Sequence, residues 1–182
     1  ILDGEAAANN RVGVFVQNDS DGVVVQGVAA KELGEAIVLR NADAAYIAGN
    51  LIAENYSCLR FVGGGIASIV ANNRLGAKPQ QITFFAENHD RLVVSGNNVF
   101  PDGYSNVVMK NCRHSTVTGN QFQSFYTGML YLEGSGCSQN TVVGNTFVSE
   151  PGPGAVWNSN PLQQWPADFG IIRIEGDQNI VA

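Results

Sequence analysis

Two carboxylates in the first third of the chain have the residue type and placement for acid–base chemistry. Asp43 and Glu54 lie in the stretch AIVLRNADAAYIAGNLIAE, which predicts a strand, a turn, a second strand and a corner. Side chains at turns can point outward, and two carboxyl groups can divide acid and base work when their surroundings make one the stronger acid. The structural alternative is a pair of turn residues that cap backbone N–H groups.

A second polar group follows the apolar run ITFFA. Glu87, Asn88, His89 and Asp90 are consecutive there, and they either line a sugar site or form an ordinary corner. We take Glu87, Asn88 and His89 as candidate substrate-binding residues. His114 has an arginine before it and is expected on a solvated turn.

The composition favours an ordered, turn-rich protein that does not bind polyanions. The chain has 182 residues, of which 45% are hydrophobic and 14% charged, so it can bury one sizeable core. Its formal net charge is −6, which argues against a nucleic-acid or anionic-membrane surface because such surfaces need clustered lysine and arginine. No apolar run reaches the length of a membrane-spanning helix. A neutral polymer such as a polysaccharide is compatible with this composition.

An internal repeat organises the chain. The pattern Gly/Asn-Asn-x-apolar recurs along the sequence, and its second-position asparagines are residues 50, 73, 97, 120 and 145, at steps of 23, 24, 23 and 25. Each unit holds short runs rich in β-branched and aromatic residues, bounded by glycine and asparagine. No helical period persists over three turns. The spacing predicts an all-β parallel β-helix in which each repeat forms one coil of two or three strands.

Stacked coils place equivalent residues above one another, about 4.8 Å apart. An asparagine tolerates the backbone angles of a tight turn, and its amide can bond the copy in the next coil. Such a ladder would satisfy turn groups that are buried between coils. We therefore predict a scaffold role rather than catalysis for Asn50, Asn73, Asn97, Asn120 and Asn145.

Several other chemistries are not indicated. The chain contains no Ser-His-Asp order, no glycine-rich phosphate loop and no H-E-x-x-H motif. Cys58, Cys112 and Cys137 are an odd number without a C-x-x-C pair, so neither a disulfide framework nor a zinc site is indicated. Cys112 and Cys137 each lie eight residues before a repeated asparagine, which predicts two stacked, buried thiols, although a disulfide is geometrically possible.

One insertion, at about residues 149–168, interrupts the rhythm. It holds both tryptophans, Trp157 and Trp165, which on such a loop either stack on sugars or pack against a neighbouring chain. The last coil stops in mid-pattern, and an open sheet edge is rarely tolerated. We therefore expect residues 1–182 to form one β-helix domain that is a portion of a longer β-helix, or whose ends a partner covers.

Three segments resemble the inulin fructotransferases and their relatives, the difructose dianhydride hydrolases. They are IVLRNADAAYIAGNLIAEN, TFFAENHDRLVVSGNNVFPDG and TGNQFQSFYTGMLYL, and the likeness covers most of residues 34–145. The fold of that family is a right-handed parallel β-helix that assembles as a trimer, with active sites between neighbouring subunits. The resemblance implies a homotrimer that acts on a fructan without a metal or other cofactor.

The resemblance also implies a catalytic pair, an aspartate and a glutamate eleven residues apart. Asp43 and Glu54 have this spacing, within matching N-A-D and I-A-E contexts. Position alone does not separate Asp43 from Asp90, which also lies seven residues before a repeated asparagine. The implied reaction is fructosyl transfer within one chain. Glu54 protonates the glycosidic oxygen, and Asp43 helps a hydroxyl of the adjacent fructose attack, which closes a cyclic difructose dianhydride. These two roles can be reversed.

Three alternatives remain open. The same pair can hydrolyse a difructose dianhydride if water attacks instead of a sugar hydroxyl. A non-enzymatic β-helix would serve as a structural or sugar-binding module. A lyase for uronate polymers is a weaker candidate, because such sites need basic residues and the chain has only 10. We expect a secreted protein for the fructotransferase, although no signal peptide is visible, and a cytoplasmic one for the hydrolase.

Overall fold

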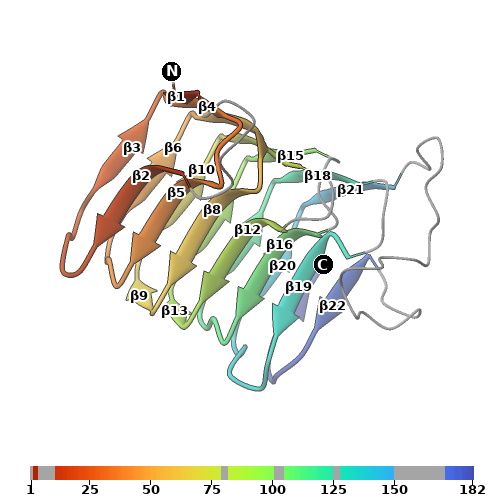
Figure 1. Cartoon of the computed structure of the whole chain (residues 1–182). Helices are drawn as coiled ribbons and strands as arrows, with labels where there is room; N and C mark the ends of the chain where they lie inside the picture. The colour runs from red at the N-terminus through yellow and green to blue at the C-terminus, as the bar shows by residue number, and fades with distance from the viewer. Residues whose placement is uncertain (1, 4–10, 79–81, 101–104, 125–127, 150–170) are drawn as a thin grey trace.

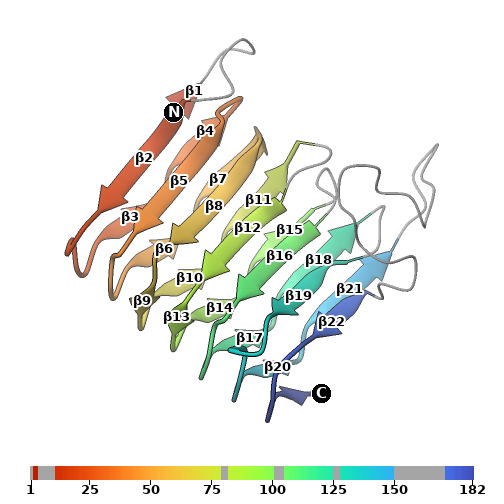
Figure 2. The ribbon, with the colours of Figure 1, turned by 60° about the horizontal axis from the view of Figure 1, so that its bottom comes forward.

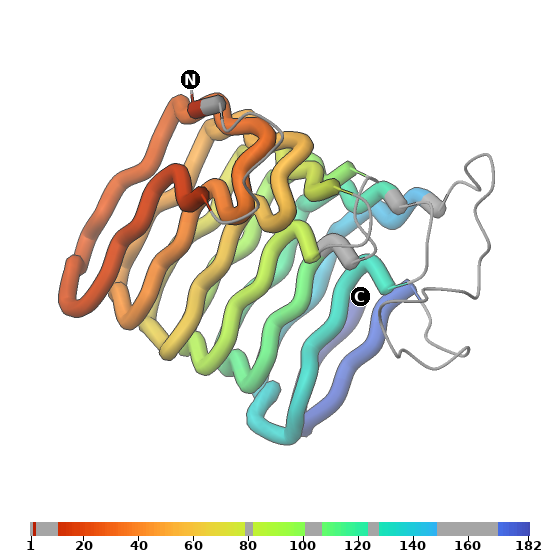
Figure 3. Tube along the Cα trace, in the orientation of Figure 1, coloured from red at the N-terminus to blue at the C-terminus, as the bar shows by residue number. Residues whose placement is uncertain are grey.

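The computed structural model describes residues 2–3, 11–78, 82–100, 105–124, 128–149 and 171–182. These residues form strands and turns without a helix, and the described part of the chain therefore has no helix that could span a membrane. The strands stack coil upon coil along one axis (Figure 1; Figure 3). The predicted all-β parallel β-helix is confirmed.

Three parallel seven-stranded sheets form the sides of the solenoid (Figure 2). Sheet A contains β1 (Leu2–Asp3), β4 (Ala29–Lys31), β7 (Leu51–Asn55), β11 (Arg74–Ala77), β15 (Asn98–Val99), β18 (Gln121–Ser124) and β21 (Thr146–Ser149). Sheet B contains β2 (Val12–Gln17), β5 (Glu35–Arg40), β8 (Ser57–Val62), β12 (Ile82–Glu87), β16 (Ser105–Lys110), β19 (Leu130–Glu133) and β22 (Ile172–Ile174). Sheet C contains β3 (Val24–Gln26), β6 (Tyr46–Ala48), β10 (Ile69–Ala71), β14 (Val93–Ser95), β17 (Thr116–Thr118), β20 (Thr141–Val143) and β23 (Ile180–Val181). A two-stranded sheet pairs β9 (Gly65–Ile66) with β13 (His89–Asp90).

Each full coil passes through sheets B, C and A in turn, as β5, β6 and β7 do. The sequence pattern indicated one strand before the repeated asparagine and one after the next corner. The third strand, in sheet A, begins directly after that asparagine. Gly49 makes the corner between β6 and β7 with a φ of 63°, a left-handed conformation that glycine adopts without strain.

Inward side chains stack in register through the core. One column runs along sheet B from Ile37 through Leu59, Phe84 and Val107 to Leu130, and every member is fully buried. Full burial of such a side chain contributes about 1.5–3 kcal/mol. Because each column member touches its copies above and below, the repeat period itself sets the packing.

The predicted asparagine ladder is confirmed. From Asn73 onward, each of these asparagine oxygens accepts two hydrogen bonds from the asparagine of the preceding coil. The backbone N of Asn50 lies 3.0 Å and its Nδ2 lies 2.9 Å from Oδ1 of Asn73. The same pair of bonds joins Asn73 to Asn97, Asn97 to Asn120, and Asn120 to Asn145. Nδ2 also donates to a strand carbonyl, as Asn97 does to Val70 at 3.0 Å.

A second ladder, which the repeat pattern did not predict, lies at the corner between sheets B and C. Ser68 accepts from the backbone N of Ala45 at 3.2 Å, and Ser115 accepts from Leu92 at 3.1 Å. Later coils use asparagine for the same bond, because Asn140 accepts from the N of Ser115, and Asn179 from the N of Asn140, each at 3.0 Å. Serine and asparagine both supply a buried acceptor oxygen there.

The three cysteines are buried free thiols, as predicted for the pair Cys112 and Cys137. Their sulfurs contact strand carbonyls, and Sγ of Cys137 lies 3.2 Å from the oxygen of Met109. Burial raises the pKa of Cys58 and of Cys112 to about 12 and that of Cys137 above its usual value. These thiols therefore stay protonated and unreactive while the coils are closed.

Candidate active site

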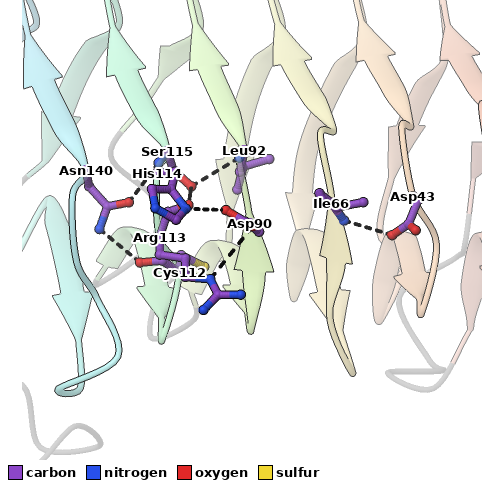
Figure 4. Close-up of polar contacts among 9 residues, drawn as sticks. All are labelled: Asp43, Ile66, Asp90, Leu92, Cys112, Arg113, His114, Ser115 and Asn140. Carbon is purple, nitrogen blue, oxygen red and sulfur yellow. Dashed lines mark hydrogen bonds and ion pairs between the residues drawn. The ribbon is translucent and has the colours of Figure 1, made fainter.

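Asp43 lies at the corner between β5 and β6, where the next coil holds it in place (Figure 4). Its Oδ1 accepts a hydrogen bond of 2.8 Å from the backbone N of Ile66, and its own backbone N lies 3.3 Å from Oδ1 of Asp21. The side chain is half-buried. Its second oxygen, Oδ2, has no hydrogen-bond partner among the described residues, so one oxygen is anchored while the other remains available.

Backbone pairing fixes the segment that holds Asp43. The N of Ala44 donates to the oxygen of Ile66 at 2.8 Å, which closes a second bond between the same two turns. Ile66 belongs to β9, which in turn pairs with β13 through Gly65–His89 and Ile66–Asp90. Three successive coils are thus joined at this corner.

His89 is the buried support of that corner, with only 2% of its surface exposed. Its Nε2 lies 3.1 Å from Oγ of Ser68, the same oxygen that accepts from Ala45. The ring packs directly against Gly65, where a Cβ would collide with it. Burial lowers the pKa of His89 to about 4, although the charges of Asp43 and Asp90 partly oppose this shift. The imidazole is therefore neutral near pH 7, and its Nδ1 is buried without a hydrogen-bond partner in the described structure.

Glu54 lies at a different corner of the same coil, at the end of β7 and before β8. It is exposed beside a shallow, mostly apolar hollow that Lys31, Leu51 and Ala53 help to line. Its φ is 58°, and Glu32 has the same left-handed conformation one coil earlier, so the strain belongs to the corner. No contact joins Glu54 to Asp43 in the described structure, and their pairing remains a prediction.

The remaining candidates fall into separate environments. Glu87 is half-buried and its Oε1 accepts from the backbone N of Gly63 at 3.0 Å, whereas Asn88 is exposed. The burial of His89 favours a supporting role over direct contact with a sugar. Trp157 and Trp165, with nearly all of the insertion at 149–168, lie outside the described residues.

One polar cluster at this corner was not found from the sequence. His114 was expected on a solvated turn, but its Nδ1 lies 2.7 Å from Oδ1 of Asp90, and Nε of Arg113 lies 3.8 Å from Oδ2 (Figure 4). Partial burial raises the pKa of Asp90, but the hydrogen bond and charge of His114, together with two nearby arginines, hold that pKa below its usual value. The spacing of 24 residues between Asp90 and His114 equals one coil, which was the available signal.

An exposed apolar face separates the corners of Asp43 and Glu54. Val24, Tyr46 and Ile69 follow one another in register along sheet C, and they are 62%, 37% and 37% exposed. Leu51, on the adjoining sheet A, is 48% exposed. A row of exposed apolar side chains such as the one on sheet C is typical of an interaction surface.

Comparison with known proteins places the chain in a family. The family described as "Periplasmic copper-binding protein (NosD)" matches residues 1–168. The inulin fructotransferase [DFA-I-forming] of Arthrobacter globiformis is 30% identical over 173 residues, which are 95% of this chain and 42% of that protein. The chain belongs to the NosD family and is a relative of the inulin fructotransferases. The family resemblance inferred from the sequence is confirmed.

Solved structures agree with this relationship. DFA-IIIase from Arthrobacter chlorophenolicus A6 matches with a TM-score of 0.82 and 35% identity, over 93% of this chain and 38% of that one. Its C387A mutant in complex with DFA-III matches with a TM-score of 0.73 and 39% identity, over 75% of this chain and 31% of that one. The chain thus spans about two fifths of the length of these relatives.

The described residues offer no set of ligands that fits the copper named in the family description. Copper prefers imidazole and sulfur ligands. The Nε2 of His89 lies against Ser68, His114 is bonded to Asp90, and the three thiols are buried against strand carbonyls. No three His, Cys, Asp or Glu side chains in the described ranges gather closely enough to hold a metal ion. We therefore assign no copper to this part of the chain.

Proposed function

We propose that this chain is part of a fructan-active enzyme that releases a cyclic difructose dianhydride from inulin, with Asp43 and Glu54 as its catalytic pair. The observation that carries the proposal is the similarity to an inulin fructotransferase over 95% of the chain. The anchored, half-buried carboxylate of Asp43 supports it, because a fixed orientation favours reaction. The names transferase and lyase both fit this intramolecular exchange of one C–O bond for another, whereas a glycosidase would pass the fructosyl group to water.

The proposed chemistry requires one carboxyl group that gives a proton and one carboxylate that takes a proton. Glu54, exposed at its corner, donates a proton to the glycosidic oxygen as the bond to the fructofuranosyl carbon breaks. Positive charge develops on that carbon, and the ionised Asp43 takes the proton from the attacking hydroxyl of the adjacent fructose. One C–O bond is exchanged for another, and the pair ends with its protonation states reversed. The opposite assignment of the two roles gives the same balance.

Hydrolysis of a difructose dianhydride is the second candidate. Its support is the similarity to DFA-IIIase, which is 35% identical over 93% of this chain. In this case Asp43 activates water instead of a sugar hydroxyl. Incubation with inulin and with the dianhydride as separate substrates, followed by chromatography of the products, decides between the two reactions.

The placement of the pair at two corners of one coil leads to a proposal for assembly. A homotrimer in which each neighbour covers the exposed apolar face would bring Asp43 of one copy toward Glu54 of the next. The hydrophobic surface of Val24, Tyr46, Leu51 and Ile69 supports such a contact. Active sites would then lie between subunits.

Isosteric variants test the catalytic pair. Asp43→Asn and Glu54→Gln are expected to abolish dianhydride formation from inulin, or dianhydride hydrolysis, while the far-UV circular dichroism and the thermal midpoint stay those of the parent. Asp177→Asn is the matched control, because it removes an exposed carboxylate from the turn between β22 and β23, several coils away from Asp43. Full activity of either Asp43→Asn or Glu54→Gln would refute the assignment.

Mixing the two inactive variants tests the assembly. In randomly mixed trimers of Asp43→Asn and Glu54→Gln chains, about a quarter of the interfaces would combine an intact Asp43 with an intact Glu54. We expect activity to return to about that fraction of the parent value after the chains are unfolded and refolded together. A mixture as inactive as its components would refute the shared site and leave the pair within one chain.

A further inference from the structure

The corner that holds Asp43 continues as a line of equivalent residues along the solenoid. The same backbone bond recurs from coil to coil, from Ala44 N to the oxygen of Ile66 at 2.8 Å and from Ala67 N to that of Asp90 at 2.8 Å. Asp90 then pairs with Arg113. Asp43 and Asp90 are therefore two coils apart on one edge, about 10 Å along the axis.

A hollow opens on this edge at the coils of Asp90 and Arg113. It is lined by Asn88, His89, Asp90, Asn111, Arg113 and Gly136. His89, whose ring is buried against the preceding coil, also belongs to its lining. Gly136 lies over the amide of Asn111, where a Cβ would come within 2.9 Å of Oδ1, so a larger residue would crowd that amide.

Polar groups around the hollow have unused hydrogen-bonding capacity. The side chains of Asn88 and Asn111 make no hydrogen bond within the described structure, and both residues are exposed. Arg113 is 60% exposed at its side chain and contacts Asp90 only through Nε. His114 commits Nδ1 to Asp90, which leaves Nε2 free on a half-exposed ring. Two amides and a guanidinium group thus line the hollow, and His114 stands beside it through its bond to Asp90.

The charges around the hollow select for an uncharged ligand. The carboxylate of Asp90 faces Arg113 and His114, and Arg91 lies nearby, so the hollow has no excess of negative charge that would favour a cation. The whole chain carries a net charge of −6, which disfavours an anionic ligand. Vicinal hydroxyls both donate and accept hydrogen bonds, and amides and guanidinium groups match them in pairs. A neutral polyhydroxylated molecule fits this set.

We propose that the hollow is a sugar-binding subsite for an internal fructosyl unit of the fructan whose end reacts at Asp43. The inference rests on the proposed function, because it takes the fructan from there. The geometric support for the subsite is that Asp43 and the hollow lie on one edge of the solenoid. A fructan that runs from Asp43 parallel to the solenoid axis reaches the hollow after about 10 Å. Such a subsite would hold the polymer in register with the reacting end.

Binding to a catalytically silent protein tests the subsite. Asp43→Asn serves as the parent, and its affinity for inulin is measured by titration calorimetry and by retardation in inulin-containing gels, with dextran as a second neutral polymer. Arg113→Ala and Asn111→Gly are introduced into it. Glycine is chosen because Asn111 has a φ of 51°, which alanine would strain. Arg60→Ala is the matched control, since Arg60 is also an exposed arginine in an ion pair, with Glu35 on sheet B.

The expected result is a loss of about tenfold in inulin affinity for Arg113→Ala and for Asn111→Gly, the typical effect of one lost hydrogen bond to a charged or well-placed group. Arg60→Ala should bind like the parent, and no variant should be retarded by dextran. Unchanged affinity of both subsite variants would overturn the subsite while leaving the proposed function in place. A parent that fails to bind inulin would overturn the fructan assignment and the subsite together.

Discussion

Replacement of one asparagine in the middle of the ladder should destabilise the protein far more than replacement of its neighbour. Asn97 is 2% exposed, and its side chain makes four hydrogen bonds. Asn97→Ala removes all four and leaves the buried backbone N of Asn73 without its acceptor. Asn98, the next residue, points outward and makes one side-chain bond, of 3.2 Å, to Gln121.

The magnitude follows from the number of bonds. A hydrogen bond contributes about 1 kcal/mol net, and a buried group left without a partner costs about 1–3 kcal/mol more. Asn73 Nδ2 retains the oxygen of Ile47, and Asn120 Oδ1 retains the backbone N of Asn97, which limits the damage. We therefore expect Asn97→Ala to lower the free energy of unfolding by about 4 kcal/mol, and Asn98→Ala by at most about 0.5 kcal/mol.

Urea unfolding followed by circular dichroism measures both values. For a chain of this size, a loss of about 4 kcal/mol lowers the thermal midpoint by about 10 °C. The slope of free energy against urea should be the same in both variants, because the buried area is unchanged. A difference below about 1 kcal/mol between Asn97→Ala and Asn98→Ala would show that the ladder is incidental to stability.

Two further predictions concern buried titratable groups. Burial lowers the pKa of His89 from 6.5 to about 4, so the stability that depends on the neutral ring is complete above pH 6.5 and is lost as the pH falls toward 4, by about 3 kcal/mol in all. His89→Gln should lack this loss. Urea unfolding of parent and variant at pH 7 and at pH 4.5 tests this, and a difference in unfolding free energy that is the same at both pH values would contradict it. The buried thiols of Cys58, Cys112 and Cys137 should not react with Ellman's reagent in the folded protein and should all react in urea, so rapid labelling of the native protein would show that the coils open.

The fold was readable from the sequence because one residue type marks every coil. Asn50 and its four equivalents recur at nearly constant steps, and a period of that length with short β-rich runs leaves few architectures. The second ladder escaped the same search because it mixes residue types. Ser68, Ser115 and Asn140 supply the same acceptor with different side chains, so no pattern of letters repeats.

The candidate site was only partly readable. Asp43 and Glu54 are close together in the sequence, yet Asp43 lies at the corner before β6 of sheet C and Glu54 lies in β7 of sheet A, beyond the Gly49 corner. His89 reads as a polar surface residue in the run ENHD, but pairing of β13 with β9 turns its ring inward over Gly65. His114 and Asp90 are distant in the sequence but in contact in the structure, because residues one period apart in a solenoid are neighbours in space.

Scaffold and chemistry share the same corners, which determines how the catalytic assignment should be tested. Oδ1 of Asp43 performs for Ile66 the task that Ser68 performs for Ala45, since each accepts a backbone N–H from an adjoining coil. Asp43→Asn keeps that acceptor and removes only the charge, whereas Asp43→Ala would also leave the N–H of Ile66 without its partner. Loss of activity in the alanine variant would therefore confound folding with catalysis. The same loss in the asparagine variant, with an unchanged thermal midpoint, would isolate the contribution of the carboxylate.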